Sequence, residues 1–476
     1  MGKINQVDMC RGALLSKIIV YAIPLLATYI LTHLFHAADL LVIGRFSKPQ
    51  SMAAIGATGS LIGFFISITC AMSVGAQVLC AQAFGSRDRN AMQKSIHTAF
   101  MATIIISVIF TIFSFIFTRK VLTWLYTPED IIDKSALYVR IYLVCLPAVA
   151  LCACGSAILR AVGDTIKPLI FLIISGIINV VLNLFFVTVC NMDVAGVAAA
   201  TSIANIISMI LTLRTLMKSS GMCRFSLRKL KIELPTLWRL LKIAIPSAVQ
   251  GSCFSLSNMT IQSAINSFGS LAVAGAATSQ IFEAIIYVVC FSLNLTATSF
   301  VAQNYGGNKY KRILKAIFWC IITTFIINAV LSGSCCYFAN GLCGFFNPDP
   351  DVIKWAVQRV YWVIPGYFIC GFMEVFCGGL RGLGYSILPA MSAILGACVF
   401  RIWWVKNIFP HYETMNSILI SYPISWLLIS CTSGLIFFII YHRIVHQKTL
   451  SFSRRQHMLP LRKKIDHNDF KTESDL

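Results

Sequence analysis

The sequence is poor in charged residues. Of its 476 residues only 12% are Asp, Glu, Lys or Arg, about half the share found in soluble domains, whereas 57% are hydrophobic. A soluble protein of this length has no place for so much apolar surface, and the mean hydropathy of +0.78 agrees. The composition excludes a soluble enzyme, a disordered chain and a nucleic-acid-binding domain, and it indicates an integral membrane protein.

Cysteine is present, but its usual chemical motifs are missing. The 18 cysteines include no C-x-x-C pair, and the closest groupings are Cys152/Cys154 and Cys335/Cys336. This spacing favours neither a zinc site nor a disulfide framework. We expect the cysteines to be small packing residues within helices.

Motifs of membrane-bound enzymes and of ATP-driven pumps are also missing. The sequence contains no H-E-x-x-H motif and no Gly-rich phosphate loop. We therefore expect neither an enzyme nor a cofactor.

Long stretches without charge predict the membrane spans. The segments Lys94–Arg119, Lys167–Asp193, Asp193–Arg214 and Glu413–Arg443 each enclose an uncharged run that is long enough for a spanning helix of about 20 residues. The runs are too long and too uniformly apolar for a β-barrel. The sequence predicts an all-α integral membrane protein with twelve helices, at 17–44, 53–81, 96–118, 136–158, 168–190, 195–217, 241–267, 271–300, 316–338, 356–380, 388–409 and 418–441.

The basic residues predict the orientation. The chain holds 39 Lys and Arg against 18 Asp and Glu, a net charge of +21. Most basic residues fall on the side of the N-terminus, with the largest clusters at 214–242 and 443–471. By the positive-inside rule we expect both termini to be cytoplasmic. We expect the protein to lie in the plasma (inner) membrane. We expect the basic tail to be flexible and to anchor the topology.

The most specific feature is an internal repeat. AQAFGS at 81–86 returns as AQNYGG at 302–307, and LRAVGDTIKPLI at 159–170 returns as LRGLGYSILPAM at 380–391. Pro24 and Pro246 open the first helix of each half. Because each half has an even number of helices, the halves enter from the same side and form parallel repeats. Two such six-helix lobes around a central cleft suit alternating access.

The repeat divides the chain into five predicted parts. A cytoplasmic N-terminal segment is expected at 1–16 and a first lobe, the N-lobe, at 17–217. A basic cytoplasmic linker at 218–240 leads to a second lobe, the C-lobe, at 241–441. The basic cytoplasmic tail at 442–476 completes the chain.

Three acidic residues lie well inside predicted helices. They are Asp39, Glu283 and Glu374. A charge at the membrane centre costs about 2.5–3.5 kcal/mol or more to insert, so such residues usually face a watery interior. We interpret them as a proton or cation relay, with pairing to a basic group or a position near the interface as the alternative.

Polar residues accompany Asp39 in the N-lobe. His33 and His36 precede it at spacings of three on one helix face, which is too weak a pattern to predict a metal site. Asn179 and Asn183 lie one turn apart in the fifth predicted helix, and Thr201 of the sixth can reach the same interior. Their amides and hydroxyl can bond a carboxylate or coordinate a cation, or simply join helices.

Aromatic and methionine side chains near the C-lobe acids suit bulky apolar cations. Phe282 and Tyr287 flank Glu283, and Met373 and Phe376 flank Glu374. We predict that these four residues contact the substrate, although each alone is more often plain packing.

The sequence resembles the multidrug and toxic compound extrusion (MATE) family. The resemblance covers nearly all of residues 10–443 and rests on IPLLATYILTHLFHAADLLVIGRF at 23–46, VGAQVLCAQAFGSRD at 74–88, LRAVGDTIKP at 159–168 and their second-half counterparts. SYPISW at 421–426 is typical of bacterial members. The resemblance implies a two-lobe, V-shaped fold that agrees with the helix count.

The resemblance also implies a function. It implies export of cationic or amphipathic drugs, coupled to inward H⁺ or Na⁺, with Asp39 as the coupling residue and Asn179 and Thr201 as its partners. At Asn183 well-described relatives carry Asp, so a two-carboxylate Na⁺ site is in doubt. The seventh helix lacks the early Glu of other members, which leaves Glu283 and Glu374 as the C-lobe carboxylates. We predict a hinge at Pro24, a monomer in contact with lipid, and no nucleic acid partner.

Three other classes remain open. Lipid-linked oligosaccharide flippases of the same superfamily share the fold but tend to carry cationic residues in the cavity. Here Arg140, Arg359 and Arg401 fall near helix ends, and the mid-helix charges are acidic. A major-facilitator transporter is poorly matched by GSRDRN at 85–90, and an integral membrane enzyme lacks its motifs.

Overall fold

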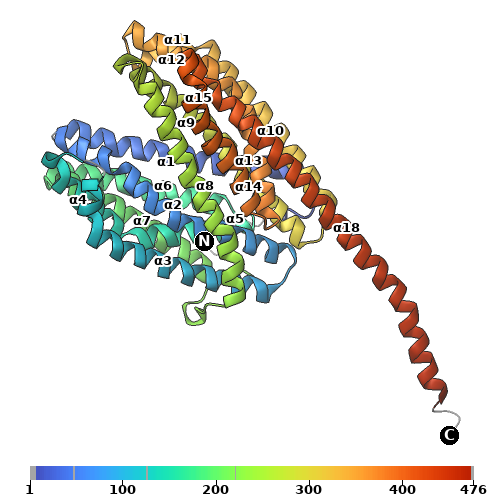
Figure 1. Cartoon of the computed structure of the whole chain (residues 1–476). Coiled ribbons are helices and arrows are strands. Elements are labelled where there is room, and N and C mark those ends of the chain that lie inside the picture. The colour runs from blue at the N-terminus through green and yellow to red at the C-terminus, as the bar shows by residue number, and fades with distance from the viewer. Residues whose placement is uncertain (1–6, 47–48, 125–126, 220, 473–476) are drawn as a thin grey trace.

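The computed structural model describes residues 7–46, 49–124, 127–219 and 221–472. Residues 1–6 of the predicted N-terminal segment and 473–476 of the predicted tail lie outside the described residues. Within that part the chain is helical throughout, joined by short turns, and contains no strand (Figure 1).

The first half runs from α1 to α7. Its elements are α1 (Leu14–Phe46), α2 (Pro49–Gly85), α3 (Arg89–Trp124), α4 (Glu129–Val144), α5 (Leu146–Ala161), α6 (Ile166–Leu184), the π-helix η1 (Phe185–Val189) and α7 (Asp193–Met217).

The second half begins after the short 3₁₀-helix η2 (Leu227–Lys229). Its elements are α8 (Leu234–Asn266), α9 (Ser270–Gly306), α10 (Tyr310–Tyr337), α11 (Ala339–Phe346), α12 (Pro350–Val363), the 3₁₀-helix η3 (Ile364–Gly366), α13 (Tyr367–Gly382), α14 (Ile387–Ala393), the π-helix η4 (Ile394–Val399), α15 (Phe400–Asn407), α16 (Phe409–Tyr412), α17 (Met415–Leu419) and α18 (Ser421–Thr472).

The helices account for the twelve predicted spans. Ten helical segments of the described chain are long and apolar enough to cross a membrane, and the pair α4 and α5 makes an eleventh. The twelfth prediction, 241–267, is α8, which has 33 residues and a polar face of Ser, Asn, Thr and Gln. Large apolar side chains such as Ile116, Phe318 and Leu435 are more than half exposed, as expected of a surface that faces lipid.

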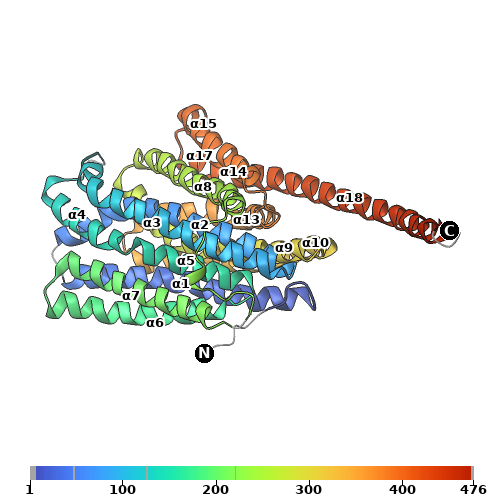
Figure 2. The ribbon, with the colours of Figure 1, turned by 90° about the horizontal axis from the view of Figure 1, so that it is seen from below.

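Two predictions about helix continuity are corrected. The helix predicted at 136–158 is broken at Cys145 and bent by 45° between α4 and α5, because Pro147 has no N–H to donate to the preceding turn. The last helix was predicted to end at residue 441. Instead α18 continues without a break to Thr472 and extends well beyond the other helices (Figures 1 and 2).

The two halves form two lobes, and the first helix of each half packs on both lobes. In Figure 1 the helices α1–α7 gather on one side and α9–α18 on the other, and the two groups meet near one end of the molecule. Across this junction α1 packs on α9 and α10, whereas α8 packs on α2 and α3. Ile18, Tyr21 and Leu25 of α1 are fully buried in a core with Phe300 of α9 and Ile317 of α10. Burial of this shared apolar surface holds the lobes together.

The repeated AQ motifs meet at the junction. Gly85 ends α2 and Gly306 ends α9, and each lies against the backbone of the other helix. A Cβ added at Gly85 would lie 2.0 Å from the carbonyl oxygen of Gln303, and a Cβ added at Gly306 would lie 2.0 Å from that of Gln82. We call this crossing the glycine contact. Any side chain at either glycine would force the helices apart.

The two glutamines beside the glycine contact bond the other repeated motif of the opposite half. Gln82 Nε2 donates to the carbonyl of Gly382 at 3.0 Å, and Gln303 Nε2 donates to the carbonyl of Ala161 at 2.7 Å. Both pairs are related by the same offset as the repeats. The repeated motifs are therefore the parts that close the two lobes against each other at this end.

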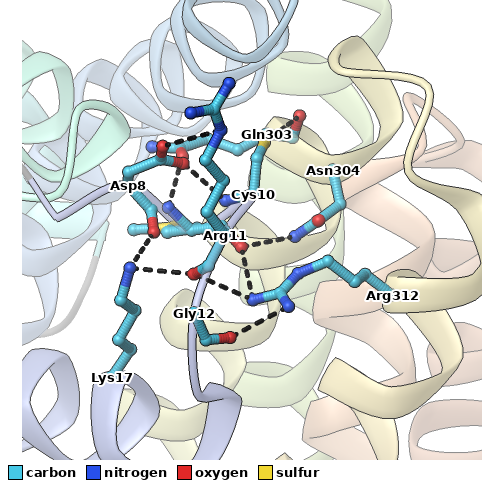
Figure 3. Close-up of polar contacts among 9 residues, drawn as sticks. Asp8, Cys10, Arg11, Gly12, Lys17, Gln303, Asn304 and Arg312 are labelled. Carbon is cyan, nitrogen blue, oxygen red and sulfur yellow. Dashed lines mark hydrogen bonds and ion pairs between the residues drawn. The ribbon is translucent and has the colours of Figure 1, made fainter.

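An N-terminal strap, residues 7–12, covers the glycine contact (Figure 3). Arg312 donates to the carbonyls of Met9, Arg11 and Gly12 at 3.0–3.2 Å, and the Met9 amide donates to Gln303 Oε1 at 3.2 Å. On the other lobe, a Cβ added at Gly163 would lie 2.6 Å from the backbone of Val7. The strap thus touches both halves.

The reactivity of the Cys10 thiol provides a measure of whether the strap is in place on α9. Its Sγ donates to the Gln303 carbonyl at 3.4 Å. Burial raises the pKa of the Cys10 thiol, with a further increase from the nearby Asp8 carboxylate. Less reactive thiolate is therefore present at neutral pH than for a free cysteine.

We expect Gly306→Ala to lower the midpoint of thermal unfolding in detergent and to speed maleimide labelling of Cys10 at pH 7. The added Cβ overpacks the glycine contact, a class of change that costs about 1–3 kcal/mol, and separation of α2 from α9 exposes the thiol. Gly333→Ala in α10 is the matched control, since its Cβ meets nothing within 4 Å. Equal midpoints and equal labelling rates in the two variants would contradict a tight crossing.

Candidate functional site

The N-lobe places the four predicted polar residues in one hydrogen-bonded chain. Asp39 comes from α1, Asn179 and Asn183 from α6, and Thr201 from α7. Asn183 Nδ2 donates to Asp39 Oδ1 at 2.5 Å and to Asn179 Oδ1 at 3.3 Å. Asn179 Nδ2 donates in turn to Thr201 Oγ1 at 3.1 Å. The one-turn spacing of the asparagines puts both amides on the α6 face that packs against α1 and α7.

Asp39 opens onto a cavity of about 340 Å³ inside the N-lobe. Tyr138 and Tyr142 of α4, His36 of α1 and Thr201 also line it. Asn183 is fully buried, and its Oδ1 has no hydrogen-bond partner within the described structure. The cavity therefore presents one carboxylate, surrounded by neutral amides, hydroxyls and rings.

Around Asp39 the described residues supply no second carboxylate. The Asn183 amide turns its nitrogen toward Asp39, whereas a cation between the two would need the amide oxygen there. Among the described residues no three His, Cys, Asp or Glu side chains gather as a metal site, and His33 and His36 form none with Asp39. A carboxylate that faces a cavity can still take up a proton from it.

The C-lobe holds a second cavity, of about 550 Å³, with charges of both signs. Its walls come from α8, α9, α12, α13, α15 and α18. The charged and aromatic residues that line it are Glu283, Tyr287, Arg359, Tyr367, Glu374, Arg401, Tyr422 and Trp426, together with Phe254.

Glu283 is neutralised by a basic partner. Arg359 of α12 donates from Nε to Glu283 Oε1 at 2.6 Å and from Nη2 to Oε2 at 3.0 Å, and Ser279 Oγ adds a third bond at 3.0 Å. Arg359 is 1% exposed. The alternative of pairing to a basic group therefore applies to Glu283, through a bidentate pair.

Glu374 has neutral partners. Asn294 Nδ2 donates to its Oε2 at 2.5 Å and the Tyr287 hydroxyl to its Oε1 at 3.2 Å. Arg381, from the repeated LR motif, bonds Asn294 Oδ1 at 3.3 Å and Gln250 Oε1 at 2.7 Å. The Asn294 amide therefore bridges the carboxylate and the guanidinium.

The four predicted substrate contacts divide into two groups. Tyr287 and Met373 line the C-lobe cavity. Phe282 instead packs edge-on against Phe346 with ring centroids 5.6 Å apart. Phe376 packs against Phe437 of α18 at 6.1 Å. Phe282 and Phe376 are not among the residues that line this cavity, and their contact with substrate stays a prediction.

Arg359 and Arg401 are the residues whose place sequence reasoning missed. They fall near predicted helix ends, yet both line the C-lobe cavity and are 1% exposed. Arg401 follows the π-helix η4, which shifts the register of the helix at that point. Their position inside low-charge segments was the only available signal. Pro24 lies inside α1 as predicted, and Thr28 Oγ1 bonds its carbonyl at 2.7 Å.

The family model MatE matches residues 24–185 and 246–404. The chain belongs to the MatE family. The model falls once on each half, from Pro24 of α1 and from Pro246 of α8, as the internal repeat requires. MatE proteins are transporters, so the prediction that the chain is not an enzyme is confirmed, as is the two-lobe helical membrane fold.

Several relatives of this MatE chain are named as multidrug resistance proteins or as transporters. It is 25% identical to the probable multidrug resistance protein YoeA of Bacillus subtilis (strain 168), covering 85% of this chain and 89% of the relative. It is 22% identical to the probable multidrug resistance protein NorM of Thermotoga maritima, covering 81% and 84%. The FAD transporter of Shewanella oneidensis is also 22% identical, over 83% and 88%.

Solved structures share the fold. The crystal structure of MATE in the bent conformation has a TM-score of 0.87 at 18% identity, covering 93% of this chain and 98% of that one. An outward-facing multidrug resistance MATE family transporter has a TM-score of 0.86 at 19% identity, covering 92% and 98%. The arrangement of the two lobes is thus that of this family.

We expect Glu283→Gln and Arg359→Gln each to lower the unfolding midpoint strongly, because each leaves one buried charge without its partner, at about 3–5 kcal/mol. The double variant should lose less than the sum of the two. Glu129→Gln, at the exposed start of α4, is the control for charge removal. A double variant whose loss equals the sum, measured by thermal unfolding in detergent, would show that the pair does not couple.

Proposed function

We propose that this MatE protein is a secondary active efflux transporter, which exports cationic or amphipathic drugs by antiport with H⁺ or Na⁺. The observation that carries the proposal is the carboxylate of Asp39, which is part-buried in the N-lobe, bonded by Asn183 and open to a cavity. The relatives named multidrug resistance proteins support the drug as cargo.

Helix α1 connects this carboxylate to the junction between the lobes. Toward the C-terminal end of α1, Asp39 accepts a hydrogen bond from Asn183 of α6. Near the start of α1, the Tyr21 hydroxyl donates to the Arg160 carbonyl at 3.0 Å and bonds Ser299 of α9 at 2.7 Å. Pro24 lies between them and removes one helical hydrogen bond, so the helix bends most readily there. A change at Asp39 can thus be transmitted to the contact with α9.

The proposed cycle follows from this link. With the site facing inward, Asp39 is ionised and holds the Asn183 amide while drug enters. With the site facing outward, Asp39 takes up a proton or cation, the bond to Asn183 weakens, α1 bends near Pro24 and drug leaves. The proton is the favoured coupling ion, since the Asn183 amide nitrogen rather than a second carboxylate faces Asp39.

The membrane potential supplies the energy. One elementary charge that crosses about 100 mV contributes about 2.3 kcal/mol. Two coupled charges would support roughly a 10³-fold drug gradient, at tenfold per 1.4 kcal/mol. Glu374 is the second carboxylate available, since it has only neutral direct partners whereas Glu283 is paired.

The positive-inside pattern supports an orientation with both termini in the cytoplasm. The glycine contact and the strap would then close the cytoplasmic end, and the site would face outward in this structure. Membrane lipid would cover the exposed apolar belt of a monomer.

We expect Asp39→Asn to abolish dye export against a gradient in proteoliposomes with an imposed pH or Na⁺ gradient. The amide can neither bind a proton near neutral pH nor carry charge. Asp133→Asn, whose carboxylate is exposed in α4, is the control. Rhodamine 6G is the dye, and the response to each gradient alone separates H⁺ from Na⁺ coupling. An Asp39→Asn protein that still concentrates the dye would refute the proposed mechanism.

A further inference from the structure

Arg401 is a buried cation without an acidic partner. It is 1% exposed, and within the described chain no carboxylate lies within ion-pair distance of it. Its Nε donates to Ser425 Oγ at 2.9 Å and its Nη1 to Asn258 Oδ1 at 3.4 Å, while Nη2 has no hydrogen-bond partner. A charged group in this state carries a desolvation cost that neutral acceptors offset only in part.

The two arginines that carry unsatisfied N–H groups border the C-lobe cavity, with the unpartnered nitrogen atoms themselves buried in its wall. Arg401 and Arg359 both border it, and Nη1 of Arg359 also lacks a partner. The two guanidinium carbons lie 4.3 Å and 5.3 Å from the centre of the same ring, that of Tyr422. Two donors without acceptors thus converge near one aromatic side chain.

The carboxylates of the cavity are already occupied. Glu283 takes two hydrogen bonds from Arg359, and Glu374 is bonded by Asn294 and Tyr287. The charge of Arg359 is therefore matched inside the protein, and that of Arg401 is not. Within the described chain, Arg401 has only the neutral acceptors of Ser425 and Asn258 and the ring faces of Tyr422 and Trp426 as partners, which leaves room for an anionic group from outside.

We infer that Arg401, with the free N–H of Arg359, binds the anionic group of an amphipathic cargo in the C-lobe cavity. A carboxylate, sulfonate or phosphate suits the planar fork of a guanidinium, which binds such groups through paired hydrogen bonds. The aromatic body of the cargo would lie against Tyr287, Met373 and Trp426, which line the same cavity.

This inference rests on the proposed efflux function and specifies its cargo. A substrate that carries a negative group beside an aromatic ring system would be held in the C-lobe. A cationic dye would not use Arg401. The two kinds of cargo would therefore respond differently to the same substitution.

The test uses two dyes with the same ring system and opposite charge. Proteoliposomes of the full chain are given 5-carboxyfluorescein, which is anionic, or rhodamine 6G, which is cationic. For Arg401→Gln we expect the KM for carboxyfluorescein to rise at least about tenfold, equivalent to about 1.4 kcal/mol, with the KM for rhodamine 6G within about twofold. Arg140→Gln is the control, because Arg140 is stacked on Phe115 at 5.5 Å in the other lobe.

If the Arg401→Gln variant does not fold, a second measurement on the protein without substitutions still tests the inference. Phenylglyoxal modifies arginine, and the rate at Arg401 is followed by peptide mass spectrometry. We expect carboxyfluorescein to slow modification of Arg401, and rhodamine 6G to leave it unchanged.

The outcomes separate the two proposals. An unchanged KM for carboxyfluorescein in Arg401→Gln, or no protection of Arg401 by this dye, would overturn the anion site. Equal loss of both dyes in a folded Arg401→Gln protein would also overturn it, since the residue would then act on the fold or the cycle. Protection of Arg401 without gradient-driven transport of either dye would sustain the anion site and refute the efflux function.

Discussion

The cost of placing charge in hydrocarbon governs how this protein is built. A buried carboxylate or guanidinium needs donors or acceptors from another helix, because lipid offers none. Asp39 is held by α6, Glu283 by α12 and Glu374 by its bond to α9. The few charges therefore fix which helices pack together, and a change in one charge alters a contact between helices.

The two halves are alike where they join and different where they bind. At the junction the repeated motifs give matching bonds, from Gln82 to Gly382 and from Gln303 to Ala161. The cavities do not match in this way. The N-lobe cavity has one acid, Asp39, and no arginine, whereas the C-lobe cavity has two acids and two arginines, of which Glu283 and Arg359 are paired. The repeat thus supplies the frame, and the differences between its copies supply distinct chemistry.

The sequence alone allowed the helices to be predicted from uncharged runs, the repeat from self-similarity, and the shared face of the two N-lobe asparagines from local spacing. Asn179 and Asn183 share a face by their separation of four. The pairing of Glu283 with Arg359 spans 76 residues, and the π-helix before Arg401 changes which way that residue points. Phe282 and Phe376 pack against other aromatic rings instead of lining the cavity. The rotation of each helix about its axis is set by packing with its neighbours, which local spacing does not show.

The strap has a consequence for how the chain is made. Met9 is synthesised well before the partner of its backbone amide, the side chain of Gln303, which lies 294 residues later. At synthesis rates of about 5–20 residues per second, the delay is about 15–60 seconds. The bonds from Lys17 to the carbonyls of Asp8 and Arg11 can form early, whereas the bonds of the strap to α9 and α10 must wait until those helices exist. Closure of this end of the molecule is therefore a late event in assembly, although one side of it is made early.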